Sequence, residues 1–128
     1  MTKNIDETSQ LVNSVIEGIF DKNGQNVLKM DMSKLDNSVC DYFIITHAQS
    51  GTQVDAICDS VLEKVKLSIG EKPIHKEGLD NRFWVLLDYG DVVVHIFMEE
   101  YRQFYNLEGL WADAETETVV DNPENLDK

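Results

Sequence analysis

The stretch FWVLLDYGDVVVHIF, residues 83–97, constrains the fold more than any other part of the chain. Two short runs of branched aliphatic and aromatic residues flank a glycine, and such runs favour β-strands. We expect strands at 83–88 and 92–97, joined by a two-residue turn at either Gly90-Asp91 or Tyr89-Gly90. Gly90 can adopt the positive φ that such a turn requires. The sequence therefore predicts an antiparallel hairpin.

The two faces of this hairpin differ, because alternate side chains of a strand point to opposite sides. One face is wholly aliphatic, and we expect it to lie under helices. It comprises Val85, Leu87, Val92, Val94 and Ile96. The other face mixes aromatic, aliphatic and polar side chains. It comprises Trp84, Leu86, Asp88, Val93, His95 and Phe97.

The mixed face has two interpretations. Aromatic anchors among a few polar groups are typical of a protein–protein interface, and unpaired polar groups are costly to bury. We therefore interpret His95 as an interface residue rather than a catalyst. The alternative is that segment 98–111 folds over this face and makes His95 a hydrogen-bonded core histidine. In either case Leu107 and Leu110 are expected to be core residues.

The rest of the chain adds helices and further strands. Apolar residues recur at helical spacing in two long segments, and Pro73 favours a sheet edge for the strand near it. Helices are expected at 6–22, 50–70 and 98–111, the last broken between Asn106 and Gly109, and strands at 26–32, 41–48 and 72–78. The predicted order is α-β-β-α-β-β-β-α. This order indicates an α+β (mixed α/β) fold with a mixed sheet of about five strands and flanking helices.

Length and charge bound the domain organisation and the partners. The 128 residues suffice for one domain, which we place at residues 1–114, followed by an acidic tail, 115–128, that is expected to be disordered. The net charge is −13, which disfavours nucleic-acid binding by a basic patch and suits a basic partner protein. Without a long apolar segment or a signal-peptide core, the chain is expected to be soluble and cytoplasmic.

No pattern in the sequence predicts a catalytic centre, a metal site or a cofactor. The histidines and cysteines do not pair at helical ligand spacing, and Cys40 and Cys58 are expected to pack as reduced thiols. A nucleotidyltransferase would need two carboxylates, spaced Asp-x-Asp on a strand, to hold its metal ions. The strand at 26–32 supplies only Asp31. We therefore expect that the protein is not an enzyme.

Three longer motifs carry a family resemblance. CDYFIITHAQSGTQVDAICDSV (40–61), WVLLDYGDVVVHIF (84–97) and YRQFYNLEGLW (101–111) closely resemble the ribosomal silencing factor family, also called the Iojap-like family. The resemblance covers about residues 8–114. The chain departs from many members at His47-Ala48, where they have Thr-Gly, and at Thr52-Gln53, where they have Arg-Gln.

The resemblance implies a function and a set of partners. It implies a nucleotidyltransferase-like topology without the active site, and no cofactor. It also implies binding to the large ribosomal subunit through its protein fourteen, which blocks the small subunit sterically and represses translation under nutrient limitation. A homodimer of the free protein is expected. The alternatives are a degenerate nucleotidyltransferase-like enzyme and a large-subunit assembly factor.

The expected partner-binding residues lie on the mixed face of the hairpin and around it. The hairpin motif is intact, and the helical segment after it is expected to frame the edge of the surface. The expected contact residues are Glu77, Trp84, Leu86, Asp88, Tyr89, Val93, His95, Phe97, Arg102, Tyr105 and Glu108.

Overall fold

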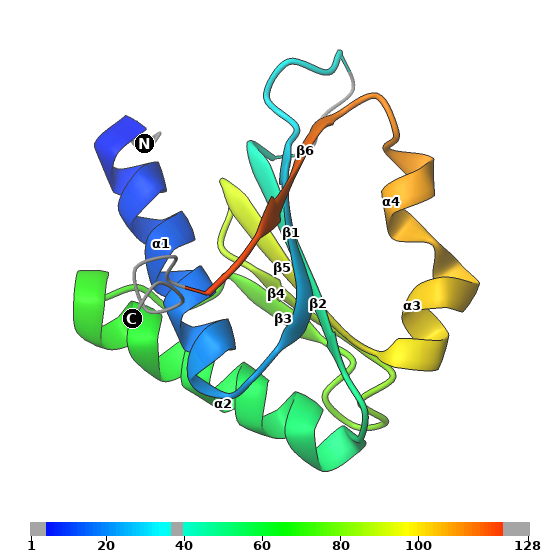
Figure 1. The fold of residues 1–128 in the computed structure, drawn as a ribbon. Coiled ribbons are helices and arrows are strands. Elements are labelled where there is room, and N and C mark those ends of the chain that lie inside the picture. Colours follow the sequence, from blue (N-terminus) through cyan, green and yellow to red (C-terminus); the bar gives the residue numbers. More distant parts are fainter. Residues whose placement is uncertain (1–4, 37–39, 122–128) are drawn as a thin grey trace, which may run out of the picture.

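A single sheet separates two unequal helical layers. The computed structural model describes residues 5–36 and 40–121. The long helices α1 (Ile5–Asp21) and α2 (Gly51–Ile69) cover one face of the sheet, and the short helices α3 (Glu99–Tyr105) and α4 (Leu107–Leu110) cover the other (Figure 1). The α+β class that the sequence predicts is confirmed.

The sheet has six strands in the order β3-β4-β5-β2-β1-β6. Their bounds are β1 (Gln25–Asp31), β2 (Tyr42–Ala48), β3 (His75–Glu77), β4 (Trp84–Asp88), β5 (Val92–Met98) and β6 (Glu115–Val119). The central pair, β2 and β5, is parallel, and every other neighbouring pair is antiparallel. The short strand β3 lies at one edge, as Pro73 predicted, because a proline nearby cannot supply a ladder N–H.

The β4–β5 hairpin closes through Gly90 and Asp91. Its register pairs Trp84 with Phe97 and Asp88 with Val93, and the Tyr89 N–H donates to the Val92 carbonyl at 2.9 Å. Gly90 has a φ of 93°, a value that side chains resist. The Asp88 carboxylate accepts the Gly90 N–H at 2.8 Å. The structure thus selects the first of the two turns that the sequence allowed.

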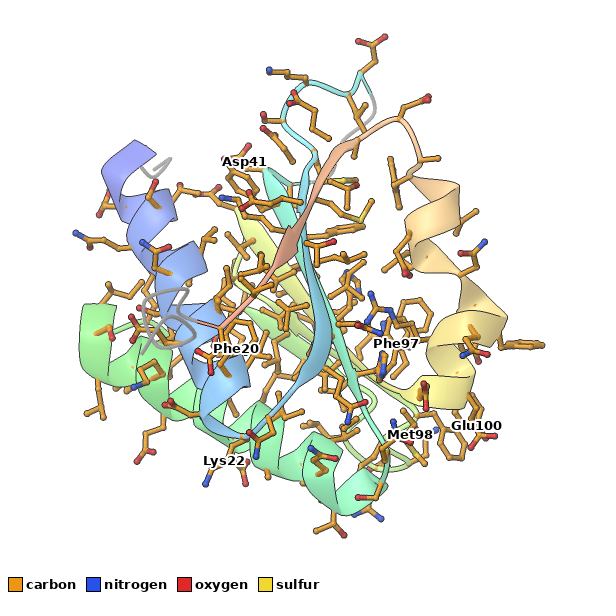
Figure 2. The ribbon with its side chains drawn as sticks, in the orientation of Figure 1. Phe20, Lys22, Asp41, Phe97, Met98 and Glu100 are labelled. Atoms are coloured by element: carbon orange, nitrogen blue, oxygen red, sulfur yellow. The ribbon has the colours of Figure 1, made fainter. Side chains whose placement is uncertain are left out.

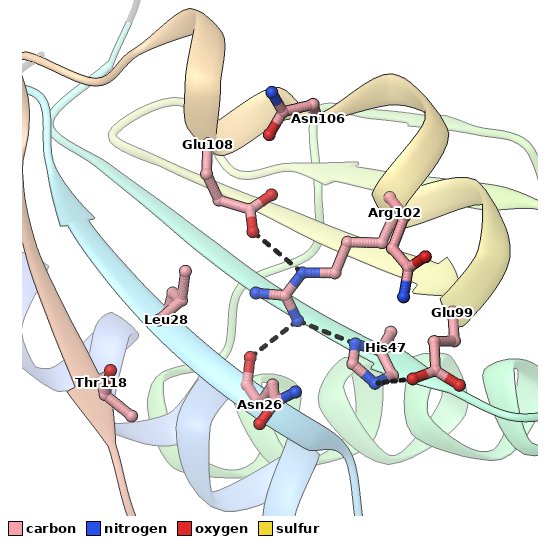
Figure 3. Close-up of a pocket in the computed structure, with 9 residues that line it drawn as sticks. Asn26, Leu28, His47, Glu99, Arg102, Asn106, Glu108 and Thr118 are labelled. Atoms are coloured by element: carbon pink, nitrogen blue, oxygen red, sulfur yellow. Dashed lines mark hydrogen bonds and ion pairs between the residues drawn. The ribbon is translucent and has the colours of Figure 1, made fainter.

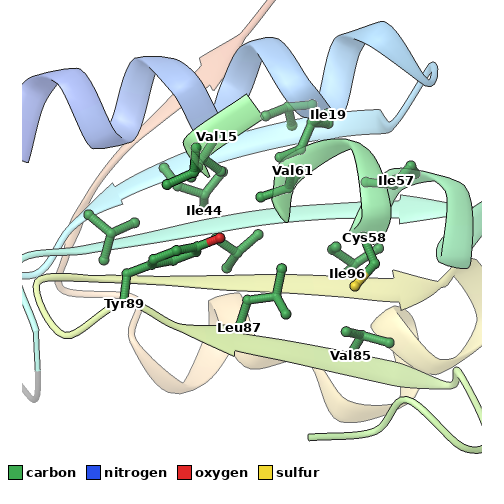
Figure 4. Close-up of a cluster of buried hydrophobic side chains, with 14 of the residues drawn as sticks. Val15, Ile19, Ile44, Ile57, Cys58, Val61, Val85, Leu87, Tyr89 and Ile96 are labelled. Carbon is green, nitrogen blue, oxygen red and sulfur yellow. The ribbon is translucent and has the colours of Figure 1, made fainter. Parts of the chain in front are cut away.

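The larger core lies between the sheet and the two long helices. The aliphatic hairpin face packs there, as predicted, against side chains of α1 and α2 (Figure 4). The helices approach closely at Gly18, where an added Cβ would lie 2.9 Å from the Val61 Cα. Ser50 caps the start of α2 by accepting the Gln53 N–H, and Gly70 ends it in a left-handed conformation. Both ends of α2 are therefore where the sequence placed them.

A second core lies on the other face of the sheet, under α3 and α4. Phe97 lies between the sheet and α3 (Figure 2), and Leu107 packs into the same cluster. The full buried set is Met30, Met32, Cys40, Phe43, Ile45, Val93, Phe97, Leu107 and Ala114. The segment 98–111 therefore does fold over the mixed face, with a break at Asn106. Leu110, expected in the core, is instead 76% exposed.

Strand β6 corrects the expectation of a disordered tail from residue 115 onward. Residues Glu115–Val119 pair antiparallel with β1, with Met30 opposite Thr116. Lys34 and Glu115 form an ion pair at 3.0 Å. Alternating Thr and Glu suit an edge strand that is held by backbone hydrogen bonds rather than by an apolar stripe. The remainder of the expected tail, 122–128, lies outside the described residues.

Candidate functional site

Five of the expected contact residues are buried, so the prediction that they form a surface is wrong. Val93, His95 and Phe97 lie in the second core because α3 and α4 supply apolar partners for the mixed face. Tyr89 shares the parity of the aliphatic face and packs in the larger core instead. Arg102 points inward from α3.

His95 is a hydrogen-bonded core residue rather than a reactive group. The indole N–H of Trp84 donates to His95 Nδ1 at 3.0 Å, and the Phe43 ring meets the imidazole edge-on, with 4.6 Å between ring centroids. Burial lowers the pKa of His95 to about 3. Its Nε2 is buried and finds no partner among the described residues. A neutral imidazole shielded from solvent is poorly placed to exchange protons with a substrate.

Four of the six expected residues that stay accessible gather at the β3–β4 edge of the sheet, where α3 passes over it. They line a pocket of about 260 Å³, which we call the edge pocket. Its lining residues are Glu77, Gly78, Asn81, Phe83, Trp84, Leu86 and Tyr105. Four of the predicted contact residues therefore do come together, namely Glu77, Trp84, Leu86 and Tyr105.

Phe83 is a pocket residue that the sequence reasoning missed. It precedes β4, and its parity would assign it to the aliphatic face if the strand continued back through it. Instead its ring stacks on Tyr101 of α3, with 4.2 Å between centroids, and 38% of the residue is exposed. The signal that could have identified it is the pair of aromatics at positions 83 and 84, since a strand end frees the first from strict alternation.

Two expected contact residues serve other roles. Asp88 accepts the Gly90 N–H in the hairpin turn. Glu108, on α4, accepts from Arg102 Nε at 3.2 Å. Neither residue lines the edge pocket. The acid that does line it is Glu77, whose carboxylate pairs with His75 on the same edge strand.

Arg102 is the centre of a second polar arrangement, under α3 (Figure 3). Its Nη1 donates to the Asn26 carbonyl at 2.8 Å and to His47 Nδ1 at 3.0 Å. Burial, followed by the neighbouring Arg102, lowers the pKa of His47. An open cleft of about 560 Å³, here called the α3 cleft, borders these groups and is also lined by Leu28 and Thr118.

The described residues offer little for metal or thiol chemistry. Within residues 5–36 and 40–121, three or more His, Cys, Asp or Glu side chains do not gather in any arrangement that could hold a metal ion. Burial raises the pKa of Cys40 to about 12 and that of Cys58 to about 11, so both thiols stay protonated. In this part of the chain, no helix is both long and apolar enough to cross a membrane.

Comparisons with known proteins identify the family. A family model described as "Ribosomal silencing factor during starvation" matches residues 5–128. The ribosomal silencing factor RsfS of Bacillus subtilis is 43% identical over 94 residues, which are 73% of this chain and 78% of that protein. RsfS of Halalkalibacterium halodurans is 38% identical over 107 residues, 84% of this chain and 90% of that protein.

A solved structure agrees with the sequence matches. The crystal structure of a Chromobacterium violaceum protein superposes with a TM-score of 0.77 at 31% identity. The match covers 97% of this chain and 99% of that one. The family resemblance that the hairpin and helix motifs predicted is confirmed. This chain belongs to the ribosomal silencing factor family.

Proposed function

We propose that the protein binds the large ribosomal subunit through ribosomal protein fourteen and, by its bulk, prevents the small subunit from joining. In this proposal it represses translation under nutrient limitation, acts in the cytoplasm and catalyses no reaction. The family provides the ribosomal role. The edge pocket supports the choice of partner-binding residues, because three aromatic side chains remain accessible there beside one carboxylate.

The edge pocket has the composition of a protein-binding surface. Phe83 and Tyr105 are 38% and 44% exposed, and the Trp84 ring is tilted against that of Tyr105 with 5.0 Å between ring centroids. Aromatic side chains with restricted freedom provide much of the energy at such interfaces. Trp84 is held from behind by its hydrogen bond to His95 and by stacking on Phe97. The buried part of the mixed face thus acts as a rigid support.

Co-sedimentation with purified large subunits tests the proposal. Tyr105→Ala removes an accessible ring and should weaken binding by about tenfold or more, the loss typical of an interface anchor. Leu67→Ala is the matched control, because Leu67 is 78% exposed and lies on α2, across the sheet. Trp84→Ala should also reduce binding, but it removes part of the second core and the partner of His95, so its melting temperature must be measured as well.

Three outcomes would count against the proposal. The proposal fails if wild-type protein stays in the supernatant when mature large subunits are pelleted. Binding to subunit precursors but not to mature subunits would favour the assembly-factor alternative. Turnover of nucleoside triphosphates with magnesium or manganese would favour the degenerate-enzyme alternative. The free homodimer stays a prediction, which light scattering of the purified protein tests.

A further inference from the structure

Helix α3 is attached to the sheet in an unusual way. Of its seven residues, the only buried one is Arg102. A surface helix ordinarily docks through an apolar stripe, whereas Phe104 and Tyr105 of α3 are exposed. Tyr101 packs on Phe83 and against the second core, and the Tyr105 ring lies 5.0 Å from that of Trp84. Beside these aromatic contacts, the buried contact of α3 with β1 and β2 at the centre of the sheet is made by the Arg102 guanidinium.

The guanidinium contacts three separate elements. Nη1 donates to the Asn26 carbonyl of β1 and to His47 of β2, and Nε donates to Glu108 of α4. We call these four residues the Arg102 latch. Because His47 Nδ1 accepts from the arginine, its ring proton is on Nε2, which lies 3.8 Å from Glu99 Oε2. A planar group with several fixed donors suits this geometry, and an ammonium group cannot reproduce all of it.

The acceptor on β1 lies at an irregularity in the strand. The β1–β2 register shifts between Gln25 and Leu28, which marks a β-bulge, and Asn26 within it has a φ of 46°. Two carbonyls at the bulge accept hydrogen bonds from side chains. Thr46 donates to that of Gln25 at 2.8 Å, and Arg102 donates to that of Asn26. Arg102 is thus matched to a local departure from regular strand geometry.

Two further features leave α3 dependent on this latch. Asn106, with a φ of 48°, ends α3 and begins α4, so a non-helical joint separates the two. The α3 cleft borders the helix on the side of β1 and β6. On that side, among the residues that the structure describes, α3 borders an open cleft, so the polar contacts of Arg102 contribute much of its attachment there.

We propose that Arg102 is a positioning residue, which holds α3 on the bulge of β1 and thereby sets the edge pocket in the arrangement that a partner meets. Only the last step of this inference, from the position of α3 to partner binding, rests on the proposed function. Tyr105 ends the helix that Arg102 anchors, and Tyr101 of the same helix stacks on Phe83, so a displaced α3 alters both aromatic walls of the pocket. Arg102 itself is buried and does not touch the partner.

Amide hydrogen exchange tests the latch without any ribosome. In Arg102→Gln, the amides of residues 99–106 should exchange about tenfold faster or more, while those of β2 and β5 keep their protection. Lys64→Gln is the control, because it removes ion pairs of Lys64 with Glu17 and Asp21 at the other helical layer. Unchanged exchange in α3 would overturn the proposal, as would an equal rise throughout the chain.

Two further variants keep the test decisive if Arg102→Gln does not fold. Glu108→Gln removes the charge of the carboxylate partner but keeps a hydrogen-bond acceptor, so a smaller rise confined to 99–106 is expected. Arg102→Lys keeps the charge and should restore only part of the protection, since one ammonium cannot make the three contacts. Full protection in both variants, or loss spread over all strands in both, contradicts a local latch.

Binding measurements complete the test. Large-subunit affinity should fall about tenfold in Arg102→Gln. In Arg102→Lys the loss of affinity should be smaller, in line with the partial protection of residues 99–106 in that variant. Faster α3 exchange with unchanged affinity would refute the positioning role while leaving the proposed function intact. If the wild-type protein itself does not bind large subunits, the proposed function fails, and the exchange experiment still decides whether Arg102 fixes α3.

Discussion

His95 shows how one buried polar side chain supports an exposed neighbour. The imidazole accepts the indole N–H of Trp84, which fixes the orientation of a ring that lines the edge pocket. The desolvated site permits only the neutral ring, because a charge there would lack both water and a counter-ion. The consequence is a dependence of stability on pH that arises in the core rather than at the surface.

We expect acid to destabilise the fold through His95. Its pKa falls from 6.5 to about 3 on folding, so between these values the unfolded chain binds a proton that the folded chain does not. The free energy of unfolding therefore decreases as the pH drops below 6.5, by up to about 1.4 kcal/mol per unit, or about 3 kcal/mol at about pH 4.5. The lowered pKa of His47 acts in the same direction.

Urea unfolding of wild type and His95→Gln at neutral and acid pH checks this expectation. Glutamine does not titrate, and its carbonyl can still accept from Trp84. The variant should be less stable at neutral pH but should lose less stability on acidification than wild type does. Curves that run parallel for the two proteins would show that His95 does not carry the effect.

The faces of individual residues could be predicted from the sequence, but their exposure could not. Strand parity correctly placed Trp84, His95 and Phe97 on one side of the hairpin. The exposure of that side depends on whether α3 and α4 pack over it. Their position is set by long-range packing of residues such as Leu107. Parity also assigns Tyr89 to the aliphatic face, where it packs, although the residue is among the expected contact residues.

Strand β6 illustrates the same limit for whole elements. The caps of α2 and the glycine turn of the hairpin are local signals, so their elements could be predicted closely. The segment ETETV has no apolar stripe. Four of its five residues are exposed, and it is attached to β1 through backbone pairing. Pairing with a strand from the other end of the domain leaves no pattern in the local sequence.

A truncation that ends the chain at Ala114 should destabilise the protein. It removes β6, opens one edge of β1 and breaks the contacts of Lys34 with Glu115 and of Lys29 with Glu117. Because these ion pairs are exposed and weak, the lost backbone pairing should dominate, with a net cost of about 1–3 kcal/mol. A chain ending at Asp121 is the reference in chemical denaturation. Identical midpoints for the two truncations would show that β6 contributes nothing.

Charge is a property of the whole molecule and affects association rather than fold. The net charge is −13, whereas four of the seven residues that line the edge pocket are aromatic or aliphatic. An acidic molecule is attracted over distance to a basic ribosomal protein, and salt screens that attraction. Apolar contacts formed after docking are not screened in this way. The two stages of binding should therefore respond differently to ionic strength.

We expect the association rate with protein fourteen to fall as salt rises, while the dissociation rate changes little. Rising salt shortens the screening length from about 10 Å at 0.1 M to about 3 Å at 1 M, which removes steering but leaves apolar burial in place. Both rates can be measured by surface-based kinetics over a series of salt concentrations. A flat association rate, or a dissociation rate that carries most of the change, would indicate buried ion pairs instead.

The pairing of β6 with β1 also determines when the protein can finish folding during its synthesis. Strand β1 is made early and β6 follows every other described element, so the outer edge of β1 stays unpaired until β6 has been made. An open strand edge on a nascent chain is a site for mispairing with other chains. Slowing translation between α4 and β6 should therefore lengthen the interval in which the chain can aggregate.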